Sequence, residues 1–286
     1  MLAALNRLRR VLATAALCAL GVAGLAGGVS AQGRLDARYV VTLAGVPIGR
    51  GSWIIDISDE QYLAEATGRT TGLLRVFTSG EGSSTSRGRV TKGNFIPSSY
   101  AAQITTDKKT EVLRINLAGG NVKDYVIDPP TPSHPDRIPI TDAHRRGVID
   151  PMTGALARVP GNGDTVTPEA CNRTLSVFDG RLRYDLRLAF KRMETVKAER
   201  GYEGPAVVCA LYFSPIAGYI PDRAAIKYLV AQRDMEAWLA PIAGTRVLVP
   251  FRVSIPTPLG AGVLEATQFV ATPLPQRASA ANAKIP

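Results

Sequence analysis

The sequence predicts an all-β protein, mainly antiparallel, formed by a single large curved sheet or open half-barrel with one or two short helices. Three observations favour this fold class. Apolar and polar residues alternate with a period of two along most of the chain after residue 37, as they do in half-buried strands. The links between these segments are of hairpin length, and only one segment carries a clear helix start. Short links between strands produce antiparallel pairs.

The first half of the chain is predicted to form a meander of strands. We expect strands at residues 38–43, 51–57, 61–69, 98–105, 112–117 and 122–127. Residues 72–77 fit either one helical turn or a strand, whereas the Gly and Ser content of residues 79–86 indicates an exposed loop or edge. Residues 128–139 hold five prolines, which favours a long surface loop because proline lacks a backbone donor.

The one clear helix start lies at Asp150 and Pro151. Aspartate is a favoured N-cap residue, and proline suits the first helical position. Met152 and Leu156 would then face a core, and we expect the helix to end near Arg158.

The clearest local signal is a hairpin over residues 174–190. Residues 174–178 lead into Asp179-Gly180, a dipeptide that suits a two-residue type I′ turn with positive φ at both positions. The return strand alternates apolar with charged residues, which is the pattern of a strand with one buried and one solvated face. Its apolar face carries Leu182, Tyr184, Leu186, Leu188 and Phe190.

The last third of the chain continues the pattern of strands. We expect them at residues 207–213, 225–232, 236–239, 245–253 and 262–271. Residues 273–286 consist of Ala, Pro and polar residues and are predicted to form a disordered tail.

Residues 1–31 carry the features of a cleaved secretory signal peptide. Three arginines precede an uncharged run at residues 11–27, and Val29-Ser30-Ala31 fits the site at which signal peptidase cuts. A membrane anchor is the competing interpretation, but glycines interrupt the run, which falls short of the roughly 20 strongly apolar residues of a span. We therefore expect cleavage near Ala31 and a curved antiparallel β domain over residues 32–272.

The expected compartment is the periplasm, with the protein soluble and not spanning the membrane after cleavage. Cys18 lies in the middle of the uncharged run rather than at the cleavage site, which argues against a lipid anchor. The processed chain keeps Cys171 and Cys209, and an even pair in an oxidising compartment favours a disulfide. Closing a loop of about 40 residues would stabilise the fold by about 3–4 kcal/mol; two buried, unpaired thiols are the alternative.

The sequence offers no constellation of reactive residues. The two histidines, His134 and His144, accompany no nucleophile motif, and no zinc-ligand spacing is present. We therefore predict a non-enzymatic protein without catalytic residues, metal ligands or cofactor. Two carboxylates of a glycosidase need no motif, so a cell-wall hydrolase remains the least favoured alternative.

The net charge points to no nucleic-acid partner. Without the three arginines of residues 1–31, the chain has 31 Lys and Arg against 24 Asp and Glu. These cations are spread along the chain rather than run together, and no nucleic-acid recognition motif is present. The sequence therefore predicts no binding to nucleic acid.

One apolar surface is a candidate ligand face. A large curved sheet exposes more concave apolar surface than one short helix covers, and such a surface suits an apolar ligand. Ordinary core packing is the competing interpretation of the same residues. The candidate face consists of Leu182, Tyr184, Leu186, Leu188, Phe190 and Trp238.

Three segments resemble a family of exported bacterial proteins known as domain of unknown function 3108. They are residues 39–49 (YVVTLAGVPIG), residues 150–156 (DPMTGAL) and residues 177–180 (VFDG), the last followed by Tyr184. The resemblance covers nearly the whole processed chain. It implies a periplasmic protein similar in fold to the open half-barrels of the lipoprotein carriers LolA and LolB and of related envelope-integrity proteins. It implies no catalytic residues, and the proline-rich loop at 128–139 departs from a compact carrier.

Two hypotheses about function follow. In the first, the protein binds a lipid, an acyl-bearing ligand or a lipoprotein segment on the concave face of the sheet. In the second, it is a structural or interaction protein that docks an envelope protein on a sheet edge or on the loop at 128–139.

Overall fold

The structure of the chain, a computed structural model, describes residues 32–72 and 79–274. Within these residues, 15 strands join in one sheet whose order is β7-β6-β5-β4-β3-β2-β1-β15-β14-β13-β12-β10-β9, with β11 paired to β15 and β8 paired to β14. The named strands are antiparallel to their neighbours except β11, which runs parallel to β15. The sheet does not close into a barrel, because β7 and β9 lie at its two ends. The predicted fold class is confirmed.

The strands and helices have the following bounds. The first seven strands are β1 Gly33–Leu43, β2 Val46–Ile57, β3 Gln61–Thr70, β4 Gly80–Thr91, β5 Asn94–Thr106, β6 Thr110–Ala118 and β7 Asn121–Asp128. The later strands are β8 Ala157–Arg158, β9 Arg173–Phe178, β10 Arg183–Lys197, β11 Arg200–Gly201, β12 Glu203–Ala217, β13 Glu236–Pro241, β14 Val247–Thr257 and β15 Gly260–Pro273. The helices are α2 Pro151–Gly154 and α3 Ala224–Ala231, with 3-10 turns η2 Asp142–Arg145 and η3 Pro168–Cys171.

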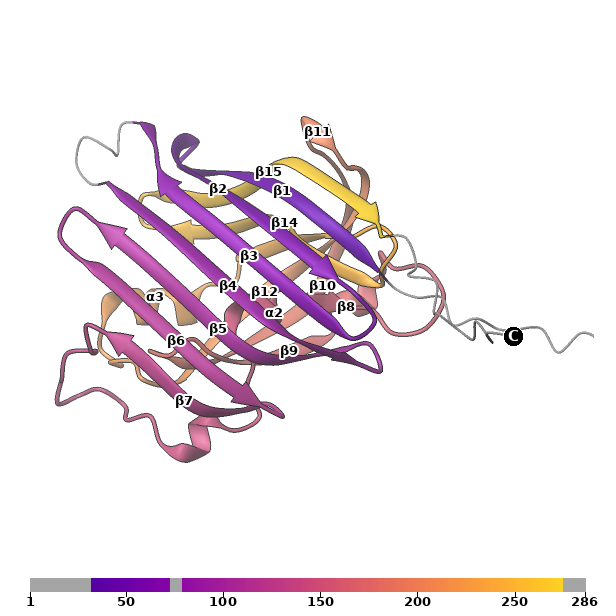
Figure 1. The fold of residues 1–286 in the computed structure, drawn as a ribbon. Helices are drawn as coiled ribbons and strands as arrows, with labels where there is room; N and C mark the ends of the chain where they lie inside the picture. The colour runs from indigo at the N-terminus through magenta and orange to yellow at the C-terminus, as the bar shows by residue number, and fades with distance from the viewer. Residues whose placement is uncertain (1–31, 73–78, 275–286) are drawn as a thin grey trace, which may run out of the picture. The chain divides into compact units, whose positions relative to one another are not determined.

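The sheet folds back on itself so that its two halves face each other. In Figure 1, strands β2 to β6 lie in front of β10, β12 and β14. Alternation places one side of β1 inward, because successive side chains of a strand point to opposite faces. Leu35, Ala37 and Tyr39 are buried there, and the Tyr39 hydroxyl donates to the Pro250 carbonyl of β14 at 2.8 Å.

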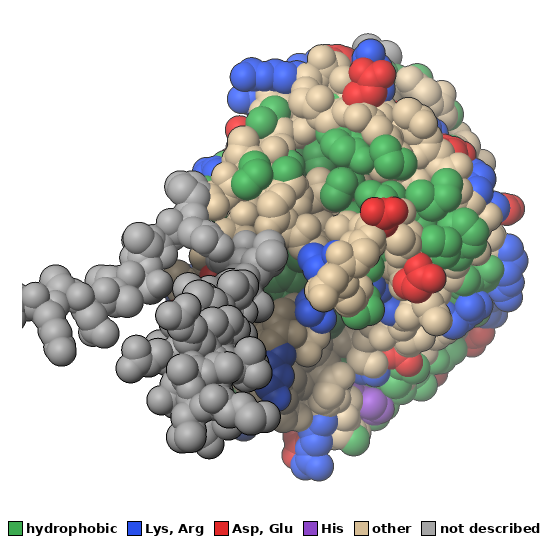
Figure 2. Space-filling model, turned by 90° about the vertical axis from the view of Figure 1, so that its right-hand side faces the viewer, with side chains coloured by type: hydrophobic (Ala, Val, Ile, Leu, Met, Phe, Trp, Pro, Cys, Tyr) green, Lys and Arg blue, Asp and Glu red, His purple; other side chains and the backbone are tan. Residues whose placement is uncertain are grey.

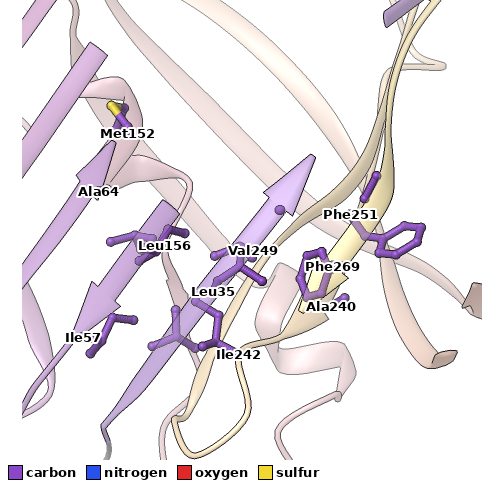
Figure 3. Packing of buried hydrophobic residues seen from close by; sticks show 14 of the residues in the cluster. Leu35, Ile57, Ala64, Met152, Leu156, Ala240, Ile242, Val249, Phe251 and Phe269 are labelled. Carbon is purple, nitrogen blue, oxygen red and sulfur yellow. The ribbon is translucent and has the colours of Figure 1, made fainter. Parts of the chain in front are cut away.

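The largest buried cluster joins these halves. Leu35 and Ile57 from the first strands pack with Val249 and Phe269 from β14 and β15, and with Ile242 between β13 and β14 (Figure 3). Each fully buried side chain of this size contributes about 1.5–3 kcal/mol through removal of its apolar surface from water. The apolar faces predicted by the period-two pattern therefore meet across the fold.

Helix α2 is fixed to the sheet by a buried polar contact. Asp150 is the N-cap, and its Oδ1 accepts from the backbone nitrogens of Met152 and Thr153 at 3.0 Å. Its Oδ2 accepts from the Thr153 hydroxyl at 2.5 Å and from the Ser86 hydroxyl of β4 at 3.1 Å. The Tyr62 hydroxyl of β3 lies 2.6 Å from Thr153 Oγ1. The predicted roles of Asp150 and Pro151 at the helix start are confirmed.

The helix is shorter than predicted. It ends at Gly154 rather than near Arg158, since glycine disfavours further helical turns. Ala157 and Arg158 instead pair with Leu248 and Val247 of β14 as strand β8. Met152 and Leu156 are buried as expected.

The two end strands of the sheet are linked by residues 146–149. The Val148 nitrogen donates to the Gly120 carbonyl before β7, and the Ile149 nitrogen donates to the Ser176 carbonyl of β9. Val148 packs with Phe178 in a small buried cluster. This segment therefore spans the gap between β7 and β9.

Two segments predicted from composition or alternation have a different structure. The Gly- and Ser-rich residues 79–86 belong mostly to β4, a strand between β3 and β5, rather than to an exposed loop or edge. Ser86 is buried, and its hydroxyl donates a hydrogen bond to Asp150. Residues 225–232 are not a strand but lie in helix α3 and its C-cap. Ile226 and Leu229 are spaced three residues apart, which places both on one face of a helix.

The hairpin between β9 and β10 has a longer turn than predicted. Phe178 pairs with Arg183, so the turn holds residues 179–182. Gly180 has a φ of 89°, but Asp179 is not in the positive-φ region, so a two-residue type I′ turn is excluded. The Asp179 carboxylate instead accepts from the backbone nitrogens of Arg181 at 2.8 Å and Leu182 at 2.6 Å, which is a side-chain-closed turn.

The proline-rich segment is a loop, as predicted, and it is bonded to the end of β12. Ile138 and Tyr219 share a backbone hydrogen bond of 2.9 Å, and the Gly218 nitrogen donates to Ile138 at 2.8 Å. Arg137 also donates to the Gly218 carbonyl at 2.5 Å.

Cys171 and Cys209 form a disulfide, with their Cα atoms 5.3 Å apart. The bond joins η3 to β12 and confirms the predicted pair. The predicted signal peptide (1–31), most of the ambiguous segment at 72–77 and all but the start of the predicted tail lie outside the described residues. Among the residues that the structure describes, no helix is long and apolar enough to cross a membrane.

Charged side chains are distributed rather than gathered. Figure 2 shows Lys and Arg spread over one face, with Asp, Glu and hydrophobic side chains between them. On that face the Lys and Arg side chains therefore form no continuous basic surface.

Removing the disulfide is expected to lower the free energy of unfolding by about 4 kcal/mol, because the bond restricts a loop of 38 residues in the unfolded chain. Urea denaturation with and without reductant measures this loss. The double variant Cys171→Ala/Cys209→Ala is the control, because its denaturation midpoint should be the same with and without reductant. Equal wild-type midpoints under both conditions would contradict the prediction.

Replacing Asp150 with Asn is expected to change the pH dependence of stability. Burial raises the pKa of Asp150 above its ordinary 3.8, so the folded protein retains a proton that the unfolded chain has lost. This contribution is full below pH 3.8 and is lost as pH rises through the folded pKa; D150N lacks it.

Urea denaturation of both proteins across the acid range measures the difference in unfolding free energy, wild type minus D150N. The difference should fall as pH rises, and a difference that grows with pH would contradict the raised pKa. Asp150→Ala serves as the structural comparison, because it removes the N-cap as well as the titrating group and should be about 1 kcal/mol less stable than D150N at every pH.

Candidate functional site

An apolar cavity of about 460 Å³ is bounded by the sheet on one side and by α2 and α3 on the other. Strands β9, β10, β12, β13 and β14 supply most of its wall. It is called the apolar cavity below. Its lining residues are Pro151, Gly154, Ala155, Ala157, Arg173, Leu175, Val177, Asp179, Leu182, Tyr184, Leu186, Leu188, Leu211, Phe213, Ile226, Leu229, Met235, Ala237, Leu239, Pro250, Val253 and Ile255.

Strand register brings the apolar side chains of β10 and its neighbours onto this wall. Leu186 lies opposite Phe213 of β12 and Leu175 of β9, and Leu188 lies opposite Leu211. Directly opposed residues of antiparallel strands point to the same face. The alternation seen in the sequence of β10 therefore continues across three strands.

The two helices cover this wall in part. Ile226 and Leu229 of α3 line the cavity, as do Gly154 of α2 and the two alanines that follow it. The sequence prediction placed residues 225–232 in a strand and so missed this wall. The spacing of Ile226, Leu229 and Val230 was the available signal, because apolar residues at i, i+3 and i+4 indicate a helix.

Four of the six residues in the predicted ligand face line the apolar cavity: Leu182, Tyr184, Leu186 and Leu188. Phe190 does not. Pairing of β9 with β10 ends at Leu188, so Phe190 lies beyond the end of β9 and is 44% exposed.

Phe190 borders a second, more polar cleft of about 580 Å³ at the start of β9, called the edge cleft below. Its lining residues are Pro168, Glu169, Asn172, Arg173, Thr174, Arg187, Leu188, Ala189 and Phe190. The apolar cavity and the edge cleft share Arg173 and Leu188.

Trp238 points away from the apolar cavity. Its sequence neighbours Ala237 and Leu239 line the cavity, and successive side chains of a strand alternate between faces. Trp238 is buried with Val208 on the other side of the sheet, and its indole nitrogen donates to Glu194 at 2.6 Å.

Two ionisable side chains line the apolar cavity besides Tyr184. Burial raises the pKa of Asp179, although backbone hydrogen bonds from Leu182 and Arg181 oppose the effect. Burial lowers the pKa of Arg173. Burial also raises the pKa of Tyr184, with a smaller contribution from the nearby Asp179 charge.

The lining of the apolar cavity holds few reactive side chains. Among the described residues that line the apolar cavity there is no histidine, no thiol and no second carboxylate beside Asp179. Across the described parts of the chain, no three His, Cys, Asp or Glu side chains are grouped as metal ligands.

A larger groove of about 970 Å³ lies along β1 to β5, on the face opposite to the largest buried cluster. Its wall is polar, with Arg38, Arg50, Arg69, Glu81 and Glu199 among small serine, threonine and glycine residues. The apolar cavity is smaller, but nearly all of its lining residues are apolar, and we take it as the candidate site.

Comparison with known proteins identifies one family. The family model described as "Protein of unknown function (DUF3108)" matches residues 38–267. No curated protein matches the chain. Among solved structures, the chain is similar to a beta-barrel-like protein of domain of unknown function DUF1849 from Brucella abortus, with 9% identity and a TM-score of 0.46 over 84% of this chain and 97% of that one.

Proposed function

The chain belongs to the DUF3108 family of proteins of unknown function, and from its apolar cavity we propose that it is a non-enzymatic periplasmic binding protein that holds an acyl chain or similarly apolar segment. The observation that carries the proposal is the wall of the cavity, which is aliphatic and aromatic except for Arg173, Asp179 and the hydroxyl of Tyr184.

The size of the cavity supports an occupant. Protein interiors are packed closely and leave few voids larger than a water molecule. A volume of about 460 Å³ instead falls in the range of about 300–1,000 Å³ that ligand pockets occupy. An acyl chain that enters gains about 0.8 kcal/mol for each methylene group removed from water.

The compartment in this proposal rests on two features. The first is the signal-peptide pattern of residues 1–31. The second is the disulfide between Cys171 and Cys209, a bond that persists in oxidising compartments such as the periplasm. Such a location brings lipids and lipoproteins of the envelope within reach of the cavity.

The alternative, docking of an envelope partner on the proline-rich loop, has less support. The loop backbone is hydrogen-bonded to Gly218 and Tyr219, and Arg181 reaches Thr131 of the loop at 3.0 Å. These bonds account for the position of the loop without a partner, whereas the apolar cavity is a space that the protein's own side chains leave unfilled.

Filling the cavity from α3 is expected to abolish binding of an apolar probe. Leu229→Trp adds a large side chain to the wall, whereas Val230→Trp adds the same side chain at the next position, which is 40% exposed and does not line the cavity. Fluorescence titration with Nile red, a neutral apolar dye, should show binding to wild type and V230W and at least about tenfold weaker binding to L229W.

Circular dichroism melts of the three proteins establish that each is folded. Lipids extracted from protein purified without detergent, identified by mass spectrometry, give a second readout. A wild-type protein that is free of lipid and does not bind Nile red would overturn the proposal, as would equal binding by L229W.

A further inference from the structure

We propose that the ligand of the apolar cavity is an amphiphile with an anionic head group, carboxylate or phosphate, and that Arg173 selects it. This inference rests on the proposed function and adds the chemical class of the ligand. It is carried by the position of Arg173, by its lack of a charged partner and by the way its backbone is held.

Arg173 lies where the apolar cavity meets the edge cleft. It is the first residue of β9 and pairs with Leu188 of β10, so both side chains point to the same face of the sheet. Both residues line the apolar cavity and also the edge cleft. A ligand with its chain in the cavity would place its head group at this boundary.

The guanidinium of Arg173 has no carboxylate partner among the described residues. Its Nη2 donates to the Arg158 carbonyl at 2.7 Å, and its Nε is buried without an acceptor. Glu169 lines the same cleft, and burial lowers the pKa of Arg173. A partly buried cation of this kind favours an anion that supplies the missing acceptors.

Three other arginines of this region have a charged or aromatic partner. Arg181 is paired with Glu111, and Arg183 with Asp185. Arg187 in the edge cleft lies over the ring of Tyr212, with its guanidinium carbon 3.9 Å from the ring centroid. Arg173 differs from them, and its planar fork matches the two oxygens of a carboxylate or phosphate.

The backbone of Arg173 is held in place from two sides. The disulfide of Cys171 with Cys209 fixes the chain two residues before it, and its β9 backbone is paired with β10. A preorganised donor loses less conformational freedom when the ligand binds. The disulfide therefore positions the start of β9 in addition to stabilising the fold.

The test compares ligands that share one alkyl chain. Dodecanoate, dodecyl phosphate and dodecanol are titrated at neutral pH against the Nile red complex of wild type, Arg173→Gln, Arg173→Lys and the control Arg50→Gln, which lies in the separate polar groove. We expect wild type to bind both anions at least about tenfold more tightly than dodecanol. R173Q should lose that preference with dodecanol binding unchanged, R173K should retain part of it, and R50Q should behave as wild type.

Several results would overturn the inference. Equal wild-type affinity for dodecanol and dodecanoate would remove the head-group preference while leaving the proposed cavity function intact. Equal weakening of all three ligands by R173Q would make the arginine structural. Acetate or inorganic phosphate that binds wild type as tightly as the alkyl compounds would indicate a site for free anions rather than for an amphiphile. Failure of every alkyl compound to bind wild type would overturn the proposed function as well.

Discussion

The carboxylate of Asp150 accepts hydrogen bonds from parts of the chain that are far apart in sequence. These bonds hold α2 at the position where it forms part of the wall of the apolar cavity. Ser86 brings β4 to this carboxylate, and Thr153 brings the first turn of α2. A buried charge-bearing group without such donors would be costly. Tyr62 extends the contact to β3 through Thr153. Polar atoms therefore hold the start of α2 against the sheet, and Gly154 and Ala155 at its end line the cavity.

The cavity follows from how the remaining surfaces are covered. In the main cluster, residues of β1 to β3 meet residues of β13 to β15, so those apolar faces cover each other. The face of β9, β10 and β12 is covered by the short helices α2 and α3, by η3 and by residues 157–159. A short helix buries a narrow stripe, and a sheet face several strands wide exceeds it. The fold thus leaves apolar surface available for a ligand.

The charged side chains near the sheet differ in their partners: some are paired within the protein, whereas Arg173 is the one that we assign to the ligand. Arg192 makes a bidentate pair with Glu236, and hydrogen bonds from Arg192 hold the pKa of Glu236 down to about 2. These groups lie near Trp238, on the side of the sheet away from the cavity. Arg173 has only a backbone carbonyl as its hydrogen-bond partner in the described structure. Arg192 and Arg173 therefore carry the same charge in different roles: Arg192 is paired within the protein, and Arg173 is assigned to the ligand.

The sequence by itself determined most of the strands, the helix start at Asp150 and the apolar face of β10, because alternation and capping are local properties of neighbouring residues. It also predicted the disulfide between Cys171 and Cys209, because Cys18 lies within the expected signal peptide. Only the tertiary structure decided which apolar residues share a cavity. Phe190 falls beyond the end of β9, and Trp238 faces the other side of the sheet. Register, bulges and the ends of pairing set these positions, and they depend on strands whose partners the local sequence does not identify.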